Sequence, residues 1–335
     1  MRRSPVTGLV LLILFVGPLH SQNSAAWKDP SPHTVQFVGV DKDVRLEVLD
    51  WGGSGRPMIL LPGGGFTAHV YDDFAPKFTA NYHVYGITRR GFGASGFSAS
   101  DNWADRLGDD VLAVMDALKL SRPILVGHSL GGTELSSVAN KRPDQVAGLI
   151  YLDAAYSYAF DNGKGASVRE IQELHGPQLP PPSAADFVSF PALQKYYERV
   201  NGFRYPEAEL RQQNEPTPGG GVGKQLDAPG NQMMATMVMA GSKKYSNIPV
   251  SALVIFANPH SQGPLIDAST DPAVRSAAKA YSDALTAFTE KQEKAVKDGV
   301  PTAHVVTIPG AHHFVFLSNE SDVLREMRAF LAGLH

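Results

Sequence analysis

The segment Ile124-Leu125-Val126-Gly127-His128-Ser129-Leu130-Gly131-Gly132 decides the fold of this chain. Its first three residues are apolar, Ser129 stands between glycines, and the residues after Gly132 are small or helix-forming. This pattern predicts a strand, a sharp turn with the serine at its tip, and a helix. Gly127 and Gly131 suit the turn because neither carries a Cβ atom where two backbone segments approach closely. Such a turn would present the Ser129 hydroxyl as a nucleophile at the carboxyl edge of a parallel sheet.

The glycine-serine-glycine spacing also has an ordinary explanation. A chain with 32 glycines can contain this spacing by chance, in a strand-to-helix turn without chemistry. The nucleophile hypothesis therefore depends on the rest of the chain. A serine hydroxyl needs a base that takes its proton, an acid that orients the base, and donors for an oxyanion.

Apolar runs on both sides of this segment predict an α/β fold with a mostly parallel central sheet flanked by helices. The first two runs are separated by Asp41-Lys42-Asp43 and predict an antiparallel hairpin at a sheet edge. The expected strands are 35–40, 44–51, 58–61, 82–87, 146–152, 250–257 and 304–308. Helices are expected near 72–78, 103–118, 131–142, 272–299 and 323–331.

The strand-helix alternation stops between residues 154 and 247. Pro180-Pro181-Pro182 excludes a helix or central strand there, and the segment is predicted to be an inserted lid of short helices and loops. Residues 27–153 and 248–335 would then form the core. Four methionines near the end of the insertion fit either a deformable apolar pocket or the interior of the lid. These are Met233, Met234, Met237 and Met239.

Residues 1–26 resemble a secretory signal peptide. Arg2-Arg3 and an apolar run over 9–16 precede small residues that end at Ala26, so cleavage after Ser21 or after Ala26 would fit. We therefore expect a secreted or periplasmic protein without stable membrane association after cleavage. The alternative is an uncleaved membrane anchor, although the apolar run is short for a bilayer.

The composition limits the remaining classes. The chain has 335 residues, is 43% hydrophobic and carries a formal net charge of −3, which gives no indication of nucleic acid binding. It has no cysteine, so disulfides cannot stabilise it after export. Its eleven histidines include no H-E-x-x-H pattern, and we expect neither a metal nor a cofactor.

Candidate partners for Ser129 follow other expected strands. Three glycines, Gly63 to Gly65, follow the strand at 58–61 and offer backbone N–H groups to an oxyanion, although a flexible turn is the alternative. His313 follows the last strand and is the expected base, in preference to its neighbour His312. His128 is adjacent to the serine, but the turn should direct it away from the hydroxyl.

The orienting acid has two candidates. The loop after the strand at 250–257 contains His260 but no carboxylate before Asp267. Asp153 ends the preceding strand and is our choice, and the chain order of Ser129, Asp153 and His313 is the one typical of this architecture. Asp267 is the reserve candidate. The alternative for Asp153 is a purely structural role in a turn.

Four motifs together resemble the α/β-hydrolase fold family, whose lid-bearing members include esterases, lipases, epoxide hydrolases and haloalkane dehalogenases. The resemblance extends from about Val35 to the C-terminus and is specific for the fold, not for a substrate. The motifs are Leu61-Pro62-Gly63-Gly64-Gly65-Phe66, Arg90-Gly91-Phe92-Gly93-Ala94-Ser95, Gly127-His128-Ser129-Leu130-Gly131-Gly132 and Pro309-Gly310-Ala311-His312-His313-Phe314.

The resemblance implies an oxyanion hole from the N–H groups of Gly64 and Leu130, with Gly65 as a further donor. It also places the catalytic histidine just before Phe314. Two departures stand out: Pro62 replaces a histidine that many members carry, and His260 stands where many have the acid. Some dehalogenase-like members carry the acid after the preceding strand, which matches Asp153.

These observations predict a secreted serine hydrolase that cleaves carboxylic esters of small molecules through Ser129, His313 and Asp153. A serine at the elbow argues against dehalogenase or epoxide hydrolase activity, because those enzymes use a carboxylate there. The alternatives are a lactonase, amidase or perhydrolase on the same triad, or a non-catalytic ligand-binding homologue.

Overall fold

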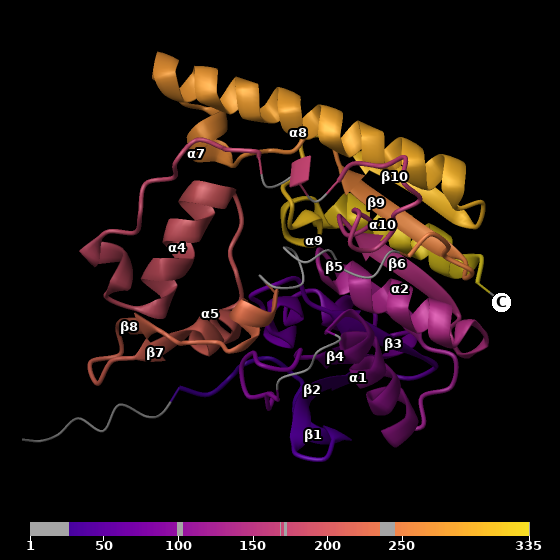
Figure 1. Cartoon of the computed structure of the whole chain (residues 1–335). Coiled ribbons are helices and arrows are strands. Elements are labelled where there is room, and N and C mark those ends of the chain that lie inside the picture. Colours follow the sequence, from indigo (N-terminus) through magenta and orange to yellow (C-terminus); the bar gives the residue numbers. More distant parts are fainter. Residues whose placement is uncertain (1–26, 99–102, 168, 171–172, 235–244, 335) are drawn as a thin grey trace, which may run out of the picture.

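The computed structural model describes residues 27–98, 103–167, 169–170, 173–234 and 245–334 (Figure 1). The predicted signal peptide at 1–26 and two of the four methionines, Met237 and Met239, lie outside the described residues. No helix of the described chain is long and apolar enough to span a membrane.

An eight-stranded sheet forms the centre of the described chain. The N-terminal hairpin is antiparallel and lies at one edge, as predicted, and β2 also pairs antiparallel with β4. All other neighbours are parallel, so the residues that follow those strands meet at one sheet edge. The spatial order is β1 (Thr34–Asp41), β2 (Val44–Gly52), β4 (Tyr82–Ile87), β3 (Arg56–Leu61), β5 (Ile124–His128), β6 (Gly148–Leu152), β9 (Ala252–Ala257) and β10 (Ala303–Ile308).

Both faces of the sheet are buried, which explains the continuous apolar runs of its central strands. Successive residues of one strand enter different cores: Leu60 and Val126 belong to one, Ile59 and Leu125 to the other. The helices that cover the sheet include α1 (Trp103–Ala117), α2 (Gly131–Lys141), α8 (Pro272–Gly299) and α10 (Glu320–Ala332).

The longest helix, α8, has the ends that its sequence predicts. Asp271 caps it by accepting the N–H of Ala273 at 2.8 Å, Pro272 is its first residue and Gly299 its last. Figure 1 shows α8 running over the sheet from α7 (Pro264–Asp267) toward β10. Phe288 and Val296 of this helix belong to the hydrophobic core.

The prediction of a helix near 72–78 is wrong. The structure instead has two short 3-10 helices, η1 (Ala68–Tyr71) and η2 (Ala75–Lys77). Pro76 lacks an N–H group and so cannot continue an α-helical hydrogen-bond ladder through this segment. Tyr71, in η1, and Phe74, just before η2, are nevertheless fully buried.

The segment between β6 and β9 contains helices and one hairpin. Helix α4 packs against α7, and α5 packs against η1. The pairing of β7 with β8 was not predicted, because this segment was expected to contain short helices and loops. The elements are η4 (Ala184–Phe187), α4 (Phe190–Asn201), α5 (Glu207–Gln213), β7 (Asn214–Pro216) and β8 (Val222–Gln225).

Candidate active site

Ser129 occupies a strained turn between β5 and α2. Its φ angle is +50°, in the left-handed region that residues with a side chain rarely adopt. A Cβ atom added at Gly131 would lie 2.6 Å from the Leu61 carbonyl oxygen, and one at Gly127 would lie 2.8 Å from the Gly131 carbonyl carbon. The glycines therefore allow three backbone segments to pack tightly beneath the serine.

His313 and Asp153 come together at the carboxyl edge of the sheet. The Nδ1 atom of His313 lies 2.6 Å from Oδ2 of Asp153, although the two residues are far apart in the sequence. Because an ionised carboxylate only accepts hydrogen bonds, Nδ1 is the donor and Nε2 is left to face other groups. Ser129 and His313 line the same cavity.

The carboxylate of Asp153 is fully buried and accepts hydrogen bonds from four groups. Besides His313, these are Nε2 of His260 at 2.8 Å, the Tyr156 hydroxyl at 2.8 Å and the Ala257 N–H at 3.1 Å. Burial alone would raise the pKa of Asp153, but the charges and hydrogen bonds of His260 and His313 outweigh burial and hold the pKa well below its usual range. Asp153 is therefore ionised at neutral pH.

The other candidates from the sequence are engaged elsewhere. Asp267 accepts hydrogen bonds from the Ser261 hydroxyl at 2.6 Å and from the Gln262 N–H at 3.3 Å, on the exposed side of that loop. His312 accepts the Phe314 N–H at 3.2 Å through Nδ1, and burial lowers the pKa of its ring to about 4. Asp153 and not Asp267 therefore contacts His313.

His128 was predicted to point away from the Ser129 hydroxyl. In the structure its ring contacts the loop that carries His313. Its Nε2 donates to the carbonyl oxygen of His313 at 3.1 Å, and the two rings lie 4.7 Å apart. Burial, followed by the charge of His313, lowers the pKa of His128 well below its usual value. The ring is therefore a neutral structural element under the site.

The loop after β3 lies beside the start of α2. A Cβ atom added at Gly64 would lie 2.8 Å from Cδ1 of Leu130, whereas one at Gly65 would meet nothing within 4 Å. Within the described turns and loops, the N–H groups of Gly64, Gly65 and Leu130 donate to no backbone carbonyl. Gly64 and Leu130 thus offer two adjacent donors, and Gly65 a third close by.

Arg89 fixes this loop from behind. Its buried guanidinium donates to the carbonyl oxygens of Pro62 at 2.7 Å and Gly63 at 3.1 Å, and it pairs with Glu134 at 2.8 Å. These hydrogen bonds hold the carbonyl groups of Pro62 and Gly63 in place, and with them the start of the loop that carries Gly64 and Gly65. Arg89 provides loop support where Pro62 replaces the expected histidine, and its role was not predicted.

Two further residues of the site were missed from the sequence. His260 was noted only for standing where an acid was expected, yet it shares the Oδ2 atom of Asp153 with His313. Tyr158 lines the same cavity as Ser129, and burial, followed by the charge of Asp153, raises the pKa of its hydroxyl above its usual value. No local sequence pattern marks Tyr158, because its position beside the serine depends on how the chain after β6 folds back.

A cavity of about 540 Å³ opens above Ser129. Its described lining contains tyrosines, aliphatic residues and histidines but no Asp, Glu, Lys or Arg. Tyr281, Leu285 and Phe288 reach it from α8, and Leu174 and Leu179 from the segment between β6 and β9. The cavity therefore suits an uncharged, largely apolar molecule.

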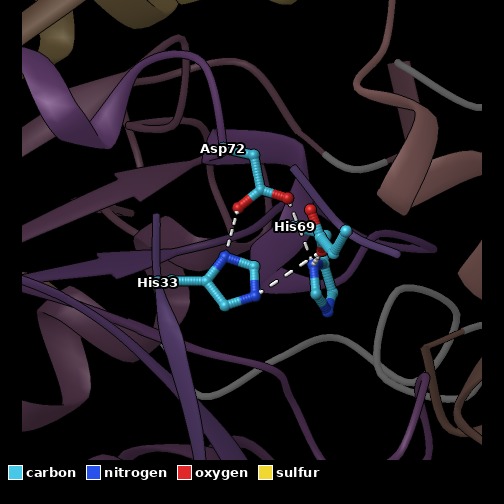
Figure 2. Close-up of side chains that lie close together, drawn as sticks. His33, His69 and Asp72 are labelled. Atoms are coloured by element: carbon cyan, nitrogen blue, oxygen red, sulfur yellow. Dashed lines mark hydrogen bonds and ion pairs between the residues drawn. The ribbon is translucent and has the colours of Figure 1, made fainter. Parts of the chain in front are cut away.

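Two groups of described side chains have donor atoms close enough to hold a metal ion. One is Asp153, His260 and His313, which is part of the site above. The other is Asp29, His33, His69 and Asp72, near the N-terminal end of the described chain. Figure 2 shows His33, His69 and Asp72 pointing toward one another.

Sequence comparison places these features in a known family. The model of the alpha/beta hydrolase family matches residues 58–326. An esterase of Mycobacterium tuberculosis is 31% identical over 113 residues, which are 33% of this chain and 37% of that protein. A (E)-2-((N-methylformamido)methylene)succinate hydrolase of Acinetobacter baylyi is 30% identical over 104 residues, 31% of this chain and 40% of that protein.

The relatives found by sequence have names that indicate different activities, and each alignment covers only part of the two proteins compared. A putative non-heme haloperoxidase of Mycobacterium phage D29 is 28% identical over 104 residues, 31% of this chain and 37% of that protein. The chain spans between about a third and a half of the length of the curated relatives it matches. Sequence similarity thus includes hydrolase- and esterase-named proteins without selecting one reaction.

Solved structures match most of the chain. The structure of E-2-(acetamidomethylene)succinate hydrolase has a TM-score of 0.61 and 19% identity, and the match covers 90% of this chain and 100% of that one. The carboxylesterase CesB from Bacillus subtilis has a TM-score of 0.56 and 15% identity, with 91% and 93% covered. At such low identity the likeness establishes the fold alone.

Proposed function

Because this chain belongs to the alpha/beta hydrolase family, we propose that it is a serine hydrolase that cleaves carboxylic esters. The observation that carries the proposal is the 2.6 Å contact between His313 and the buried, ionised Asp153, in a cavity that Ser129 also lines. A serine, a histidine and a carboxylate in this relation are what nucleophilic acyl transfer requires.

In the proposed reaction, Ser129 Oγ attacks the ester carbonyl while Nε2 of His313 takes its proton. Asp153 holds the Nδ1–H tautomer of His313 and stabilises the imidazolium that forms. The N–H groups of Gly64 and Leu130, with Gly65 as a further donor, stabilise the oxyanion. His313 then protonates the leaving alcohol, and water, deprotonated by the same imidazole, releases the acid from the acyl-enzyme.

The cavity favours neutral esters with apolar groups. A carboxylate or ammonium on the substrate would lose its hydration against the apolar lining without an oppositely charged residue among the described lining. We also propose that residues 154–247 act as the lid, since Leu174 and Leu179 of this segment line the cavity together with Ser129. The lid would then determine which acyl and alcohol groups are accepted.

Replacing the nucleophile tests the proposal. Ser129→Ala should lower kcat/KM for short p-nitrophenyl esters by about 10⁴-fold or more, because the acyl-enzyme can no longer form. A fluorophosphonate probe should label the wild type but not Ser129→Ala. A variant that retains full activity would disprove the mechanism. A wild type that is folded but neither labels nor hydrolyses would identify a non-catalytic binding protein.

A substrate panel tests the bond that is cleaved. Matched esters, lactones and amides with the same apolar acyl group, and an ester with hydrogen peroxide as acceptor, should give the highest kcat/KM for the esters. If a lactone, an amide or peroxide were preferred, the proposed roles of Ser129, His313 and Asp153 would still hold. The proposed function, however, would no longer be ester hydrolysis.

We further propose that the protein is exported and that residues 1–26 are removed. The basic start, the short apolar run and the small residues before Trp27 support this proposal. N-terminal sequencing of the protein from the extracellular or periplasmic fraction should find a start at Gln22 or Trp27. An intact N-terminus in the membrane fraction would instead indicate an anchor.

A further inference from the structure

A second histidine-carboxylate group lies behind the loop that follows β3, at Asp29, His33, His69 and Asp72. Asp29 and His33 come from the segment before β1, and His69 and Asp72 from η1 and its end. His33, His69 and Asp72 have almost fully buried side chains, whereas that of Asp29 is 24% exposed. We call these four residues the N-terminal cluster.

The spacing of the donor atoms matches a tetrahedral site. Oδ2 of Asp29 lies 3.6 Å from Nε2 of His33 and 3.5 Å from Nδ1 of His69. The same Nδ1 makes a hydrogen bond of 3.2 Å with Oδ2 of Asp72, so a bound ion would have to replace the proton that Nδ1 carries there. Metal–ligand bonds of about 2.0–2.1 Å at tetrahedral angles place neighbouring ligand atoms about 3.3 Å apart. The three separations scatter around that value.

The tautomer of His33 points its free electron pair into the cluster. Its Nδ1 lies 2.9 Å from Oδ1 of Asp72, which only accepts hydrogen bonds, so Nδ1 carries the proton (Figure 2). A neutral His33 therefore directs the lone pair of Nε2 toward Asp29. Two electron-rich atoms 3.6 Å apart repel each other unless a proton or a metal ion lies between them.

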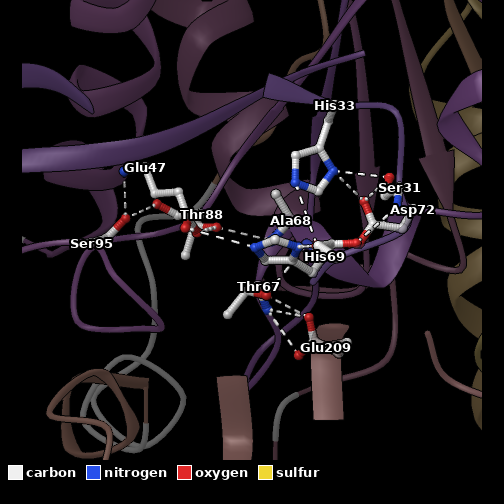
Figure 3. Close-up of polar contacts among 11 residues, drawn as sticks. Ser31, His33, Glu47, Thr67, Ala68, His69, Asp72, Thr88, Ser95 and Glu209 are labelled. Atoms are coloured by element: carbon white, nitrogen blue, oxygen red, sulfur yellow. Dashed lines mark hydrogen bonds and ion pairs between the residues drawn. The ribbon is translucent and has the colours of Figure 1, made fainter. Parts of the chain in front are cut away.

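The surroundings resemble the outer shell of a metal site. Histidine ligands of zinc usually donate their second ring N–H to a carboxylate or carbonyl oxygen. His33 does so to Oδ1 of Asp72, whose other oxygen is one of the proposed ligand atoms, and Nε2 of His69 faces Oε1 of Glu47 at 3.7 Å. Figure 3 shows His69 lying between Asp72 on one side and Thr67, with Glu209, on the other.

Negative charge exceeds positive charge in this region. The region contains three carboxylates, those of Asp29, Asp72 and Glu47. Among the described residues, these carboxylates form ion pairs with His33 and His69 but not with a Lys or Arg. The two imidazoles offset this charge only when they are protonated, whereas a divalent cation bound to both of them would offset two of the three negative charges. Nitrogen and oxygen donors in a four-coordinate arrangement suit Zn²⁺ better than Ca²⁺ or Mg²⁺.

We infer that the N-terminal cluster is a structural Zn²⁺ site formed by Asp29, His33, His69 and Asp72. The ion joins the segment before β1 to η1, and thereby secures the chain that follows the loop carrying Gly64. The inference does not depend on the proposed ester hydrolysis. This inference departs from the expectation that the protein holds no metal, which rested on the absence of cysteine and of the H-E-x-x-H pattern. The proposed site instead combines one D-x-x-x-H segment, Asp29 to His33, with one H-x-x-D segment, His69 to Asp72. These two segments come together only after folding.

Binding measurements test the site directly. The full chain without a polyhistidine tag, after treatment with EDTA, should bind one equivalent of Zn²⁺ in calorimetry with a micromolar or lower Kd. Co²⁺ should give the visible d–d absorption of a tetrahedral ion. Saturating Zn²⁺ should raise the Tm by about 4 °C, since the ion binds only the folded chain. A wild type that binds no Zn²⁺ would show that the cluster is an ion-pair network alone.

Variants locate the ion. His33→Gln and Asp29→Asn should each weaken Zn²⁺ binding at least tenfold and abolish its effect on Tm. Asp29→Asn is the safer variant for folding because its side chain is the most exposed of the four. The matched control His83→Gln removes a histidine paired with Asp50 on another surface and should bind Zn²⁺ as the wild type does.

One further variant distinguishes this site from the candidate active site, which has its own metal-capable group. His260→Gln should leave the single Zn²⁺ equivalent and its Kd unchanged. Binding that survives in Asp29→Asn and His33→Gln but disappears in His260→Gln would place the ion at Asp153 and overturn the inference.

Discussion

Two histidine-carboxylate clusters in this molecule have the same kinds of residue and different surroundings. Around Asp153, His313 is 38% exposed at the side chain and borders a cavity beside a strained serine. In the N-terminal cluster, the side chains of His33 and His69 are only 3% and 5% exposed. Oγ of Ser31 lies 2.9 Å from Nδ1 of His33, but neither histidine lines the cavity beside Ser129.

This difference shows how access and neighbours select the chemistry of a histidine. An imidazole that shuttles protons needs one nitrogen on a carboxylate and the other facing a reactant. His313 has Nδ1 on Asp153 and borders the cavity that Ser129 also lines, which is compatible with the proposed role. His33 and His69 are surrounded by carboxylates, which suits a fixed cation instead. Residue type alone does not separate these two roles.

The largest effect is expected from removing the charge of the buried acid in the active-site cluster. Asp153→Asn should lower kcat/KM for a p-nitrophenyl ester about 10³-fold, because the amide no longer enforces the Nδ1–H tautomer of His313. Steady-state kinetics at neutral pH measure this loss, with far-ultraviolet circular dichroism as the control for folding. An activity within tenfold of the wild type would mean that another residue orients His313.

The same substitution in the N-terminal cluster should affect stability instead of activity. Asp72→Asn leaves His33 and His69 buried with one carboxylate fewer and should lower the free energy of unfolding by about 3 kcal/mol. Denaturant unfolding measures the change, and kcat/KM of the folded variant should stay within threefold of the wild type. A loss of activity as large as that of Asp153→Asn would remove the distinction between the clusters.

Glu209 connects the insertion to the N-terminal cluster and should make stability depend on pH. It is fully buried on α5, accepts the Thr67 hydroxyl at 2.5 Å, and burial raises its pKa to about 7 despite its hydrogen bonds with Thr67. Two titratable groups interact electrostatically with Glu209. The charge of His69 acts on Glu209, and the charge of Glu209 acts on Tyr205. A raised carboxyl pKa means that the folded chain binds more protons than the unfolded chain between about pH 4.5 and 7.

The stability contributed by Glu209 is therefore complete below about pH 4.5 and is lost as the pH rises to about 7. The unfolding free energy of the wild type, minus that of Glu209→Gln, should fall by about 3 kcal/mol across this range. Urea unfolding at several pH values measures the difference, in which most other titrating groups cancel. A difference that is constant with pH would contradict the prediction.

The smallest effect is expected at His260, which positions Asp153 without being the proposed base. His260→Ala should lower kcat about tenfold and leave KM within twofold, because Asp153 loses one of its four hydrogen bonds. His260→Gln keeps a donor and should recover most of kcat. Equal losses of kcat in the two variants would show that His260 acts only by filling space.

Much of the fold was predictable because its strands are determined locally. Runs such as Leu60-Leu61 and Val126-Gly127 are buried on both faces and therefore apolar throughout, and glycines or prolines end them. The ends of α8 were predictable because Asp271, Pro272 and Gly299 act on the backbone beside them. The wrong prediction near 72–78 did not take account of Pro76, which prevents a continuous α-helix and leaves short 3-10 helices there.

The candidate site was predictable only in part. Ser129 and His313 follow strands, so the position of each along the chain indicates the sheet edge where they meet. Arg89, Tyr158 and His260 carry no such mark, since their contacts are with residues brought close by separate parts of the chain. The choice between Asp153 and Asp267 likewise needed the position of both side chains relative to His313.

The sequence by itself determined the order of strands and helices, the tight turn at Ser129 and the set of candidate partners, because these depend on short-range backbone preferences and on periodic burial. Only the tertiary structure decided that Asp153 contacts both His260 and His313, and that Asp29 and His33 face His69 and Asp72. Such contacts depend on how distant segments pack against one another, and local residue patterns contain no measure of that distance.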